Sequence, residues 1–287
     1  MKQEWKFAVL GSPIAHSRTP ALQTFFAEEA GFRASCDRIE SVEAELPARL
    51  PELTDRGYDG FNCTMPLKTA MAGLCDSLSK ESALLSSVNT VSLKNRTVVG
   101  TTTDGDGVSA MIQDECGDSF FKKAKVTLLG AGGAARSVAL SLTLAGAELT
   151  VLNRTEEKAE SLSAMLISAG LSAPKVLPLD QAGLSEAADC DLLFQATSLG
   201  MMGKESFSSL SFLDKLPPDA VVADAVYEPL ETDFLKEAKA RGHLTFDGLS
   251  MLVYQGALSF ETWTGKRPDA ALCRRAYRFL QDKNEEN

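Results

Sequence analysis

Residues 125 to 140 constrain the fold of this chain more than any other stretch. They read Lys-Val-Thr-Leu-Leu-Gly-Ala-Gly-Gly-Ala-Ala-Arg-Ser-Val-Ala-Leu. The apolar run from Val126 to Leu129 predicts a buried strand, and residues that favour helix follow the glycines as far as Gly146. A strand, a glycine turn and a helix in this order predict the beginning of a βαβ unit.

The glycines of this turn predict a phosphate-binding site. Glycine permits a tight turn and lets backbone N–H groups approach an anion, and the N-terminus of the following helix favours negative charge. The residues expected to hold a pyrophosphate are Gly130, Ala131, Gly132, Gly133 and Ala134. An ordinary strand-to-helix turn remains an alternative, because this motif has low specificity by itself.

The end of the next predicted strand indicates which dinucleotide binds. Residues 148–152 are mostly apolar and are followed by Asn153, Arg154 and Thr155. Enzymes that use NAD usually carry Asp or Glu here to bind the ribose 2′-hydroxyl, whereas arginine suits a 2′-phosphate. The sequence therefore predicts NADP. Lys158 can add positive charge, or it can be a solvated lysine on the helix surface.

Composition excludes several classes of protein. With 39 acidic and 29 basic residues the net charge is −10, which argues against a nucleic-acid partner. No apolar run reaches the roughly 18 residues of a membrane span and the N-terminus has no apolar signal core, so we expect a cytoplasmic protein. Six scattered cysteines and two histidines argue against structural zinc and disulfides, and we expect no metal. A monomer and a homodimer are both compatible with the sequence.

The pattern along the chain predicts an α/β protein of two domains. Residues 1–64 read as βαβαβ, which predicts a parallel sheet with ligands at the carboxyl ends of its strands. We expect a helix over 68–86, a hairpin over 89–100 and a hinge in the glycine-rich run 100–107. The expected domains are a substrate-binding and catalytic domain over 1–103, a Rossmann NADP-binding domain over 104–247, and C-terminal helices over 248–287 that pack on the first domain.

A lysine is the best candidate for proton transfer. His16 is expected to order a turn, and His243 stands at a helix end, where histidine is common. Lys68 opens a helix directly after a strand end, and Asp104 lies in the expected hinge, from which it can face Lys68. From the residues alone, a surface lysine and a helix-capping aspartate remain alternatives.

Read together, the motifs resemble the shikimate dehydrogenase family, whose members reduce 3-dehydroshikimate reversibly with NADPH. The similarity covers nearly the whole chain. The matching stretches are Gly11-Ser-Pro-Ile-Ala-His-Ser-Arg-Thr-Pro20, Asn62-Cys-Thr-Met-Pro-Leu-Lys68, Val88-Asn89-Thr90, Thr103-Asp-Gly-Asp-Gly107, Gly130-Ala-Gly-Gly-Ala134, Asn153-Arg154-Thr155, Ala196-Thr-Ser-Leu-Gly-Met201, Asp224-Ala-Val-Tyr-Glu-Pro229 and Gly248-Leu-Ser-Met-Leu-Val-Tyr-Gln255.

The resemblance implies a role for each matching residue. Lys68 and Asp104 would form the catalytic pair. The substrate carboxylate would bind to hydroxyls, and the ring hydroxyls to amides and Asp104, within a pocket also lined by an aromatic residue. These substrate-binding residues would be Ser17, Thr19, Thr64, Asn89, Asp104, Tyr227 and Gln255. The cofactor would bind to residues 130–134, to Asn153, Arg154, Thr155 and Lys158 at its 2′-phosphate, and to Thr197, Ala225, Gly248 and Met251 at its nicotinamide.

The chain departs from the family pattern at six positions. They are Thr19, Gln23, Thr24, Cys63, Thr102 and Gln195, where the family usually has Ser, His, Asn, Val, Asn and Asn. These departures leave the identity of the substrate open: quinate, or another cyclic polyol or amino analogue, is an alternative to shikimate. A regulatory NADP-binding protein without turnover is a more distant alternative, against which the retention of Lys68 and Asp104 argues.

Overall fold

The computed structural model describes residues 4–285 and divides the chain into two compact units. The first unit contains Met1–Gly107 and Leu252–Asn287, and the second contains Val108–Met251. The chain passes between the units inside two helices, α5 (Asp104–Cys116) and α10 (Gly248–Thr264). The expectation of an irregular hinge is therefore wrong for residues 104–107, which form the first turn of α5.

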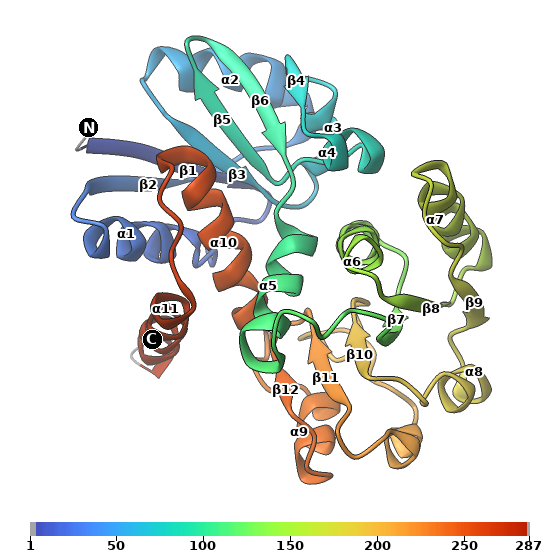
Figure 1. Ribbon diagram of the computed structural model, residues 1–287. Coiled ribbons are helices and arrows are strands. Elements are labelled where there is room, and N and C mark those ends of the chain that lie inside the picture. The colour runs from blue at the N-terminus through green and yellow to red at the C-terminus, as the bar shows by residue number, and fades with distance from the viewer. Residues whose placement is uncertain (1–3, 286–287) are drawn as a thin grey trace. The chain divides into compact units, whose positions relative to one another are not determined.

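The first unit is built on a six-stranded mixed sheet with the order β2-β1-β3-β5-β6-β4 (Figure 1). Three parallel strands come from the βαβαβ pattern, and a hairpin adds antiparallel strands next to β3. The strands are β1 (Glu4–Gly11), β2 (Arg33–Glu40), β3 (Gly60–Cys63), β4 (Ser77–Leu78), β5 (Thr90–Lys94) and β6 (Thr97–Thr101). The predicted parallel arrangement is confirmed for β1, β2 and β3, and the predicted hairpin is formed by β5 and β6.

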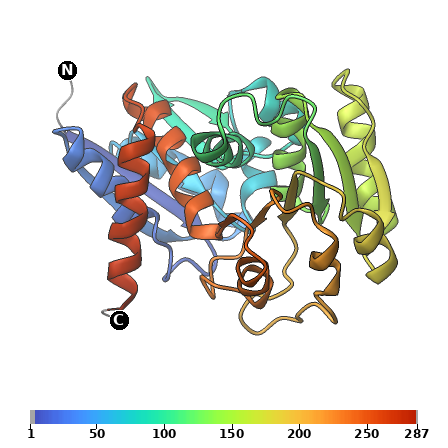
Figure 2. The ribbon, with the colours of Figure 1, turned by 60° about the horizontal axis from the view of Figure 1, so that its bottom comes forward.

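Helices from both ends of the chain cover this sheet. The N-terminal ones are α1 (Thr19–Glu29), the 3₁₀ turn η1 (Glu43–Glu45), α2 (Leu46–Asp55), α3 (Lys68–Ala72) and α4 (Lys80–Leu85). The residues of α10 from Leu252 onward and α11 (Ala270–Glu285) also belong here, and Figure 2 shows both helices alongside α1. The ring of Trp263 stacks on Phe7 at 4.5 Å and its Nε1–H donates to the carbonyl of Val91 at 2.9 Å. This contact fixes α10 against the sheet.

The second unit is a parallel sheet with the order β12-β11-β10-β7-β8-β9. Its strands are β7 (Lys125–Leu129), β8 (Glu148–Asn153), β9 (Lys175–Pro178), β10 (Leu192–Gln195), β11 (Val221–Asp224) and β12 (Thr245–Phe246). Its helices are α6 (Gly133–Leu144), α7 (Glu156–Ser168), α8 (Gln181–Glu186), the 3₁₀ turn η2 (Ser211–Lys215) and α9 (Asp233–Ala240). The strand order changes direction at β7, so right-handed crossovers put α6 and α7 on the opposite face from α8 and α9 (Figure 1). This is the predicted Rossmann arrangement.

The expected single helix over residues 68–86 is wrong. The chain forms α3, ends it at Gly73, adds the short strand β4 and then begins α4. The Ser79 side chain caps α4 by accepting the N–H of Ser82 at 3.1 Å, which gives the second helix its own start. Strand β4 forms because Ser77 and Leu78 pair with β6, a long-range contact that helical propensity does not report.

Among the described residues, no helix is at once long enough and apolar enough to cross a membrane.

Candidate active site

The carboxyl ends of β1 and β3 bring two loops of the first unit together. Thr64 follows β3, and its N–H donates to the carbonyl of Leu10 at 2.9 Å. The N–H of Ser12, just after β1, donates in turn to the carbonyl of Met65 at 3.0 Å. These reciprocal bonds fix the start of α3, so that Lys68 begins a helix at a defined position.

Lys68 and Asp104 form an ion pair within the first unit. The Nζ atom of Lys68 lies 2.6 Å from Oδ2 of Asp104, and the two side chains are 26% and 10% exposed. The carbonyl of Lys68 accepts the N–H of Val88 at 3.0 Å, which ties α3 to the segment that carries Asn89. The predicted proximity of the lysine and the aspartate is thus present, and the lysine keeps a path to solvent.

Two amide side chains surround the carboxylate of Asp104. Nδ2 of Asn89 donates to Oδ1 of Asp104 at 2.7 Å and lies 3.3 Å from Oε1 of Gln255. Counted as whole residues, backbone included, Asn89, Asp104 and Gln255 are each at most 7% exposed. Gln255 can reach this cluster because Gly107 has no side chain: a Cβ there would lie 2.7 Å from the backbone nitrogen of Gln255. Helices α5 and α10 therefore meet at the cluster.

Behind these residues lies a second set of polar side chains. The Ser259 hydroxyl lies 2.7 Å from that of Thr90 and accepts a bond from Nδ2 of Asn62 at 2.9 Å. The Thr103 hydroxyl joins this set to Nδ2 of Asn89 at 3.0 Å. The sequence interpretation missed Ser259, although it stands one helical turn after Gln255 and therefore on the same face of α10.

The residues expected at the substrate carboxylate lie at the start of α1. Thr19 is the first residue of this helix and is 4% exposed, and its N–H lies 3.4 Å from the Ser17 hydroxyl. Arg38, at the end of β2, donates from Nε to the carbonyl of Ser17 at 2.9 Å. The loop therefore carries two hydroxyls and a nearby guanidinium, a combination suited to an anionic group.

In the second unit, the glycine turn provides an anion-binding helix terminus. Gly130 has a φ of +112°, a left-handed value that favours glycine, and a Cβ there would lie 2.9 Å from the carbonyl oxygen of Ala196. Gly132 caps α6 and is exposed, as is Gly133, and a Cβ on either would meet open space. The first turn of α6 has no acidic side chain. Free N–H groups without a competing carboxylate fit a pyrophosphate.

Arg154 stands at the end of β8 as the sequence predicts. Its side chain is 85% exposed, and its guanidinium lies 3.5 Å from the carboxylate of Glu205, which is itself 81% exposed. Asn153 turns toward its own loop, since Nδ2 donates to the carbonyl of Thr155 at 2.7 Å, and Lys158 is exposed on α7. Sequence reasoning missed Glu205, which is distant in sequence from Arg154.

The residues expected near the nicotinamide follow the ends of β10 and β11 and open α10. Thr197 follows β10, and its hydroxyl accepts the N–H of Leu199 at 3.1 Å. The N–H of Ala225 donates to the carbonyl of Gln195 at 2.8 Å, and that of Gly248 to Val226 at 3.1 Å. Met251, at 9% exposure, ends the part of α10 in this unit. Tyr227 also belongs to the second unit, whereas the other expected substrate-binding residues belong to the first.

Three of the six departures from the family pattern concern packing of the first unit. Gln23 is fully buried, and its Nε2 donates to the carbonyl of Gly256 on α10 at 3.0 Å. The Thr24 hydroxyl donates to the carbonyl of Pro20 within α1 at 2.9 Å. Cys63 is a core residue, and burial raises the pKa of its thiol far above the usual value. These three side chains therefore serve the packing of the first unit.

Neither histidine belongs to the cluster around Lys68. His16 is exposed in the loop before α1. His243 is buried and its Nδ1 lies 3.1 Å from the carbonyl oxygen of Ala220 at the start of β11. That proton transfer does not rest on histidine stays a prediction.

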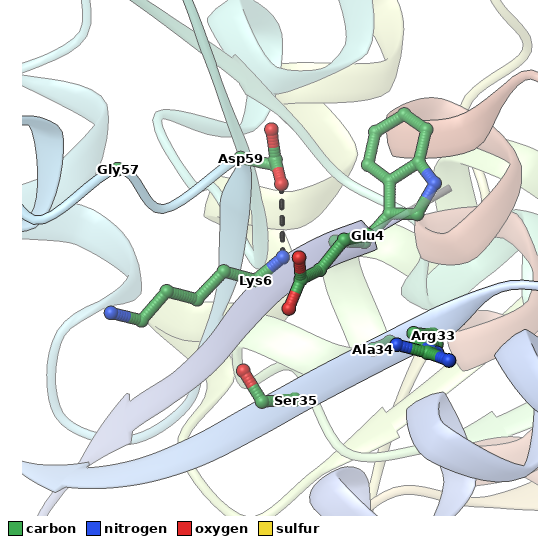
Figure 3. Close-up of a pocket in the computed structure, with 8 residues that line it drawn as sticks. Glu4, Lys6, Arg33, Ala34, Ser35, Gly57 and Asp59 are labelled. Atoms are coloured by element: carbon green, nitrogen blue, oxygen red, sulfur yellow. Dashed lines mark hydrogen bonds between the residues drawn. The ribbon is translucent and has the colours of Figure 1, made fainter. Parts of the chain in front are cut away.

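A hollow of about 630 Å³ lies at the other end of the first sheet (Figure 3). It is lined by the first residues of β1 and β2 and by the segment before β3, with Asp59 accepting the backbone N–H of Lys6 at 2.9 Å. Ligands of parallel sheets bind at the carboxyl ends of the strands, and this hollow lies at the amino ends. None of the expected site residues lines it.

Three family models match consecutive parts of the chain. The shikimate dehydrogenase substrate binding domain matches residues 9–91, the shikimate / quinate 5-dehydrogenase model matches 113–209, and the shikimate 5′-dehydrogenase C-terminal domain matches 248–276. The matched ranges contain most of the expected site residues, and Asp104, Ala225 and Tyr227 lie outside them.

Similar proteins cover nearly the full length. The shikimate dehydrogenase (NADP(+)) of Moorella thermoacetica is 38% identical over 273 residues, 94% of this chain and 92% of that protein. The structure of shikimate 5-dehydrogenase from Thermus thermophilus with NADP(H) and shikimate is 36% identical, with a TM-score of 0.81 over 96% of this chain and 98% of the other. The 5-ketofructose reductase of a Gluconobacter strain is 30% identical, with a TM-score of 0.84 over 96% and 99%. The chain belongs to the shikimate dehydrogenase family.

Proposed function

We propose that this chain is an NADP-dependent shikimate dehydrogenase, which reduces 3-dehydroshikimate reversibly to shikimate. The observation that carries the proposal is the ion pair of Lys68 and Asp104 within a cluster of buried amides. An oxidoreductase that acts on an alcohol must move one proton for each hydride, and this pair is a proton-transfer group at the carboxyl ends of the strands. Membership of the family supports the same activity.

Lys68 is the group that we assign to proton transfer. In the direction of reduction, the carbonyl carbon would accept the hydride that NADPH supplies when bound. Lys68 gives a proton from Nζ to the carbonyl oxygen, so that C=O becomes CH–OH, and it regains a proton from solvent through its partly exposed side chain. Asp104 holds Nζ in position through the 2.6 Å bond.

The amides limit where substrate hydroxyls can bind. Nδ2 of Asn89 has two hydrogens, and it already lies within 3.3 Å of acceptors on Thr103, Asp104 and Gln255. A substrate hydroxyl must therefore take the place of the longest of these contacts, the one to Gln255. We assign hydroxyl recognition chiefly to Asp104 and Gln255, with Asn89 orienting both.

The second unit fits NADP through its own residues. The N-terminus of α6 would bind the pyrophosphate, and Arg154 would bind the 2′-phosphate in exchange for its bond to Glu205. We assign residues 130–134, Asn153, Thr155 and Lys158 to the same half of the cofactor. Thr197, Ala225, Gly248 and Met251 are assigned to the nicotinamide, and Tyr227 to the substrate.

One assay tests this function and its alternatives. The purified protein is given NADP⁺ with shikimate, with quinate and, in the reverse direction, NADPH with 5-ketofructose. We expect kcat/KM to be highest for shikimate. A higher kcat/KM for quinate would instead identify the protein as a quinate dehydrogenase, the other activity that the family model names. Tight NADP binding without turnover of any of these substrates would favour a regulatory protein.

We also propose a cytoplasmic location and a monomer or homodimer. None of the cysteines in the described part of the chain is joined in a disulfide, and three of them are buried, which fits a reducing compartment. Cell fractionation and analytical ultracentrifugation would decide these two points.

A further inference from the structure

Gln195 is a buried amide whose hydrogen bonds join three segments of the second unit. It is the last residue of β10, and its side chain is fully buried. Oε1 accepts a short bond from the N–H of Thr197. Nε2 donates to the carbonyl of Leu199 at 2.9 Å and to Oδ1 of Asp224 at 3.2 Å. The amide thus binds both the loop that follows its own strand and the end of β11.

Asp224 is the matching residue at the end of β11. It pairs with Gln195 in the register of the two parallel strands and is 1% exposed. Its Oδ1 also accepts the N–H of Val226 at 2.9 Å, and its Oδ2 accepts the Thr232 hydroxyl at 2.8 Å. Each of these groups donates its hydrogen to the carboxylate, as an ionised acceptor requires. The pair therefore holds the loop after β11 in the same way as the loop after β10.

The loops held by this pair are packed directly on two further cofactor segments. A Cβ on Gly130, in the phosphate turn, would lie 3.2 Å from Cγ2 of Thr197. A Cβ on Gly248, at the start of α10, would lie 2.4 Å from the carbonyl oxygen of Ala225. A shift of either loop would therefore displace, or leave a gap beside, the turn or helix that it contacts.

We propose that Gln195 and Asp224 are positioning residues that hold the nicotinamide-binding loops in the geometry required for cofactor binding. This inference rests on the proposed NADP binding and goes beyond it, because neither side chain is assigned a contact with the cofactor. Gln195 has one methylene more than the asparagine usual in the family. We infer that this length lets one nitrogen reach both Leu199 and Asp224.

Direct binding of two ligands tests this inference without turnover. NADPH uses the whole cofactor site, whereas 2′-AMP carries neither the pyrophosphate nor the nicotinamide and reports only the adenosine and 2′-phosphate part of the site. Gln195→Met keeps the length of the side chain and removes its hydrogen bonds, and Gln195→Asn shortens it but keeps the amide. We expect Gln195→Met to lower the affinity for NADPH at least fivefold and Gln195→Asn to lower it less. Both variants should bind 2′-AMP within twofold of the wild type.

The outcomes separate the positioning role from a structural one. An equal loss of affinity for both ligands, or an unchanged affinity for NADPH, would overturn the inference. Thermal melting shows whether Gln195→Met folds. If it does not, Gln195→Asn is compared with the wild type using the same two ligands, and the inference then requires that its affinity for NADPH be at least twofold lower. Wild-type turnover of shikimate is measured separately. Its absence would refute the proposed substrate and leave the binding comparison intact.

Discussion

Replacing Lys68 with alanine tests the assigned proton transfer most directly. The change removes the ammonium that lies 2.6 Å from Oδ2 of Asp104. Asp104 keeps its 2.7 Å bond from Asn89 and its place in the first turn of α5, so the carboxylate stays ordered. A lost charge-assisted hydrogen bond costs about 1.5–3 kcal/mol, which a folded domain can tolerate. The variant should therefore fold and bind NADPH as the wild type does.

The expected effect is on turnover. General acid–base assistance is typically worth about 10²–10⁴ in rate, so kcat for shikimate oxidation should fall by that factor. Steady-state reduction of NADP⁺ gives kcat and KM, and NADPH fluorescence gives the cofactor affinity. Lys80→Ala removes an exposed lysine at the start of α4 and is the matched control, which should leave kcat unchanged.

A second variant separates charge from proton transfer. Lys68→Arg keeps a positive charge beside Asp104 but cannot release a proton at working pH, so it should be nearly as slow as Lys68→Ala. If Lys68→Ala kept kcat within about threefold and only raised KM for shikimate, Lys68 would be a binding residue. The proton would then have to move through water or Asp104.

Three further predictions concern the cofactor, the substrate and the pH. Arg154→Ala should lower the affinity for NADP⁺ about tenfold and leave the affinity for NAD⁺ nearly unchanged. Glu205→Gln should raise the affinity for NADP⁺ by less than about fivefold, because exposed ion pairs are weak. Calorimetric titration with both cofactors measures these affinities. Thr19→Ser should change the ratio of kcat/KM for shikimate and quinate, at a stability cost of about 1 kcal/mol for the buried methyl, and an unchanged ratio would remove Thr19 from the specificity argument. Burial raises the pKa of Asp224 from 3.8 to about 6, so its contribution to stability is full below pH 3.8 and is lost as the pH rises through 6. Urea unfolding between pH 4 and 7.5 should show a loss of up to about 3 kcal/mol that Asp224→Asn lacks.

The parts of the fold that the sequence predicts are those set by local patterns. Apolar residues next to glycines predict β1, β3 and the phosphate turn, because burial and turn chemistry act over a few residues. The helix expected over 68–86 fails because β4 depends on pairing with β6, about twenty residues later. The local pattern of glycines at 105 and 107 suggests a hinge. In the structure, position 107 has no room for a side chain because Gln255 packs against it.

The same distinction applies to the candidate site. Lys68 and Asp104 are candidates from their places after a strand end and in the expected hinge. The family motifs single them out as the catalytic pair and add Asn89 and Gln255. Ser259 was missed, because its contact with Thr90 joins residues that are 169 positions apart. Glu205 was missed for a related reason: its bond to Arg154 depends on how the loop after β10 returns toward β8.

The structure also indicates where members of this family can change substrate. In the roles proposed above, Lys68, Asp104 and Gln255 would recognise an alcohol or a ketone with neighbouring hydroxyls, which are features of any polyol. Selectivity for a carboxylate needs separate groups, and in this chain we assign it to the loop of Ser17 and Thr19. The backbone of that loop is held by Arg38 from β2, which is not a member of the proton-transfer cluster. Substitutions in the loop can therefore alter the substrate class without disturbing the proton-transfer pair, which is consistent with the presence of a 5-ketofructose reductase among the similar structures.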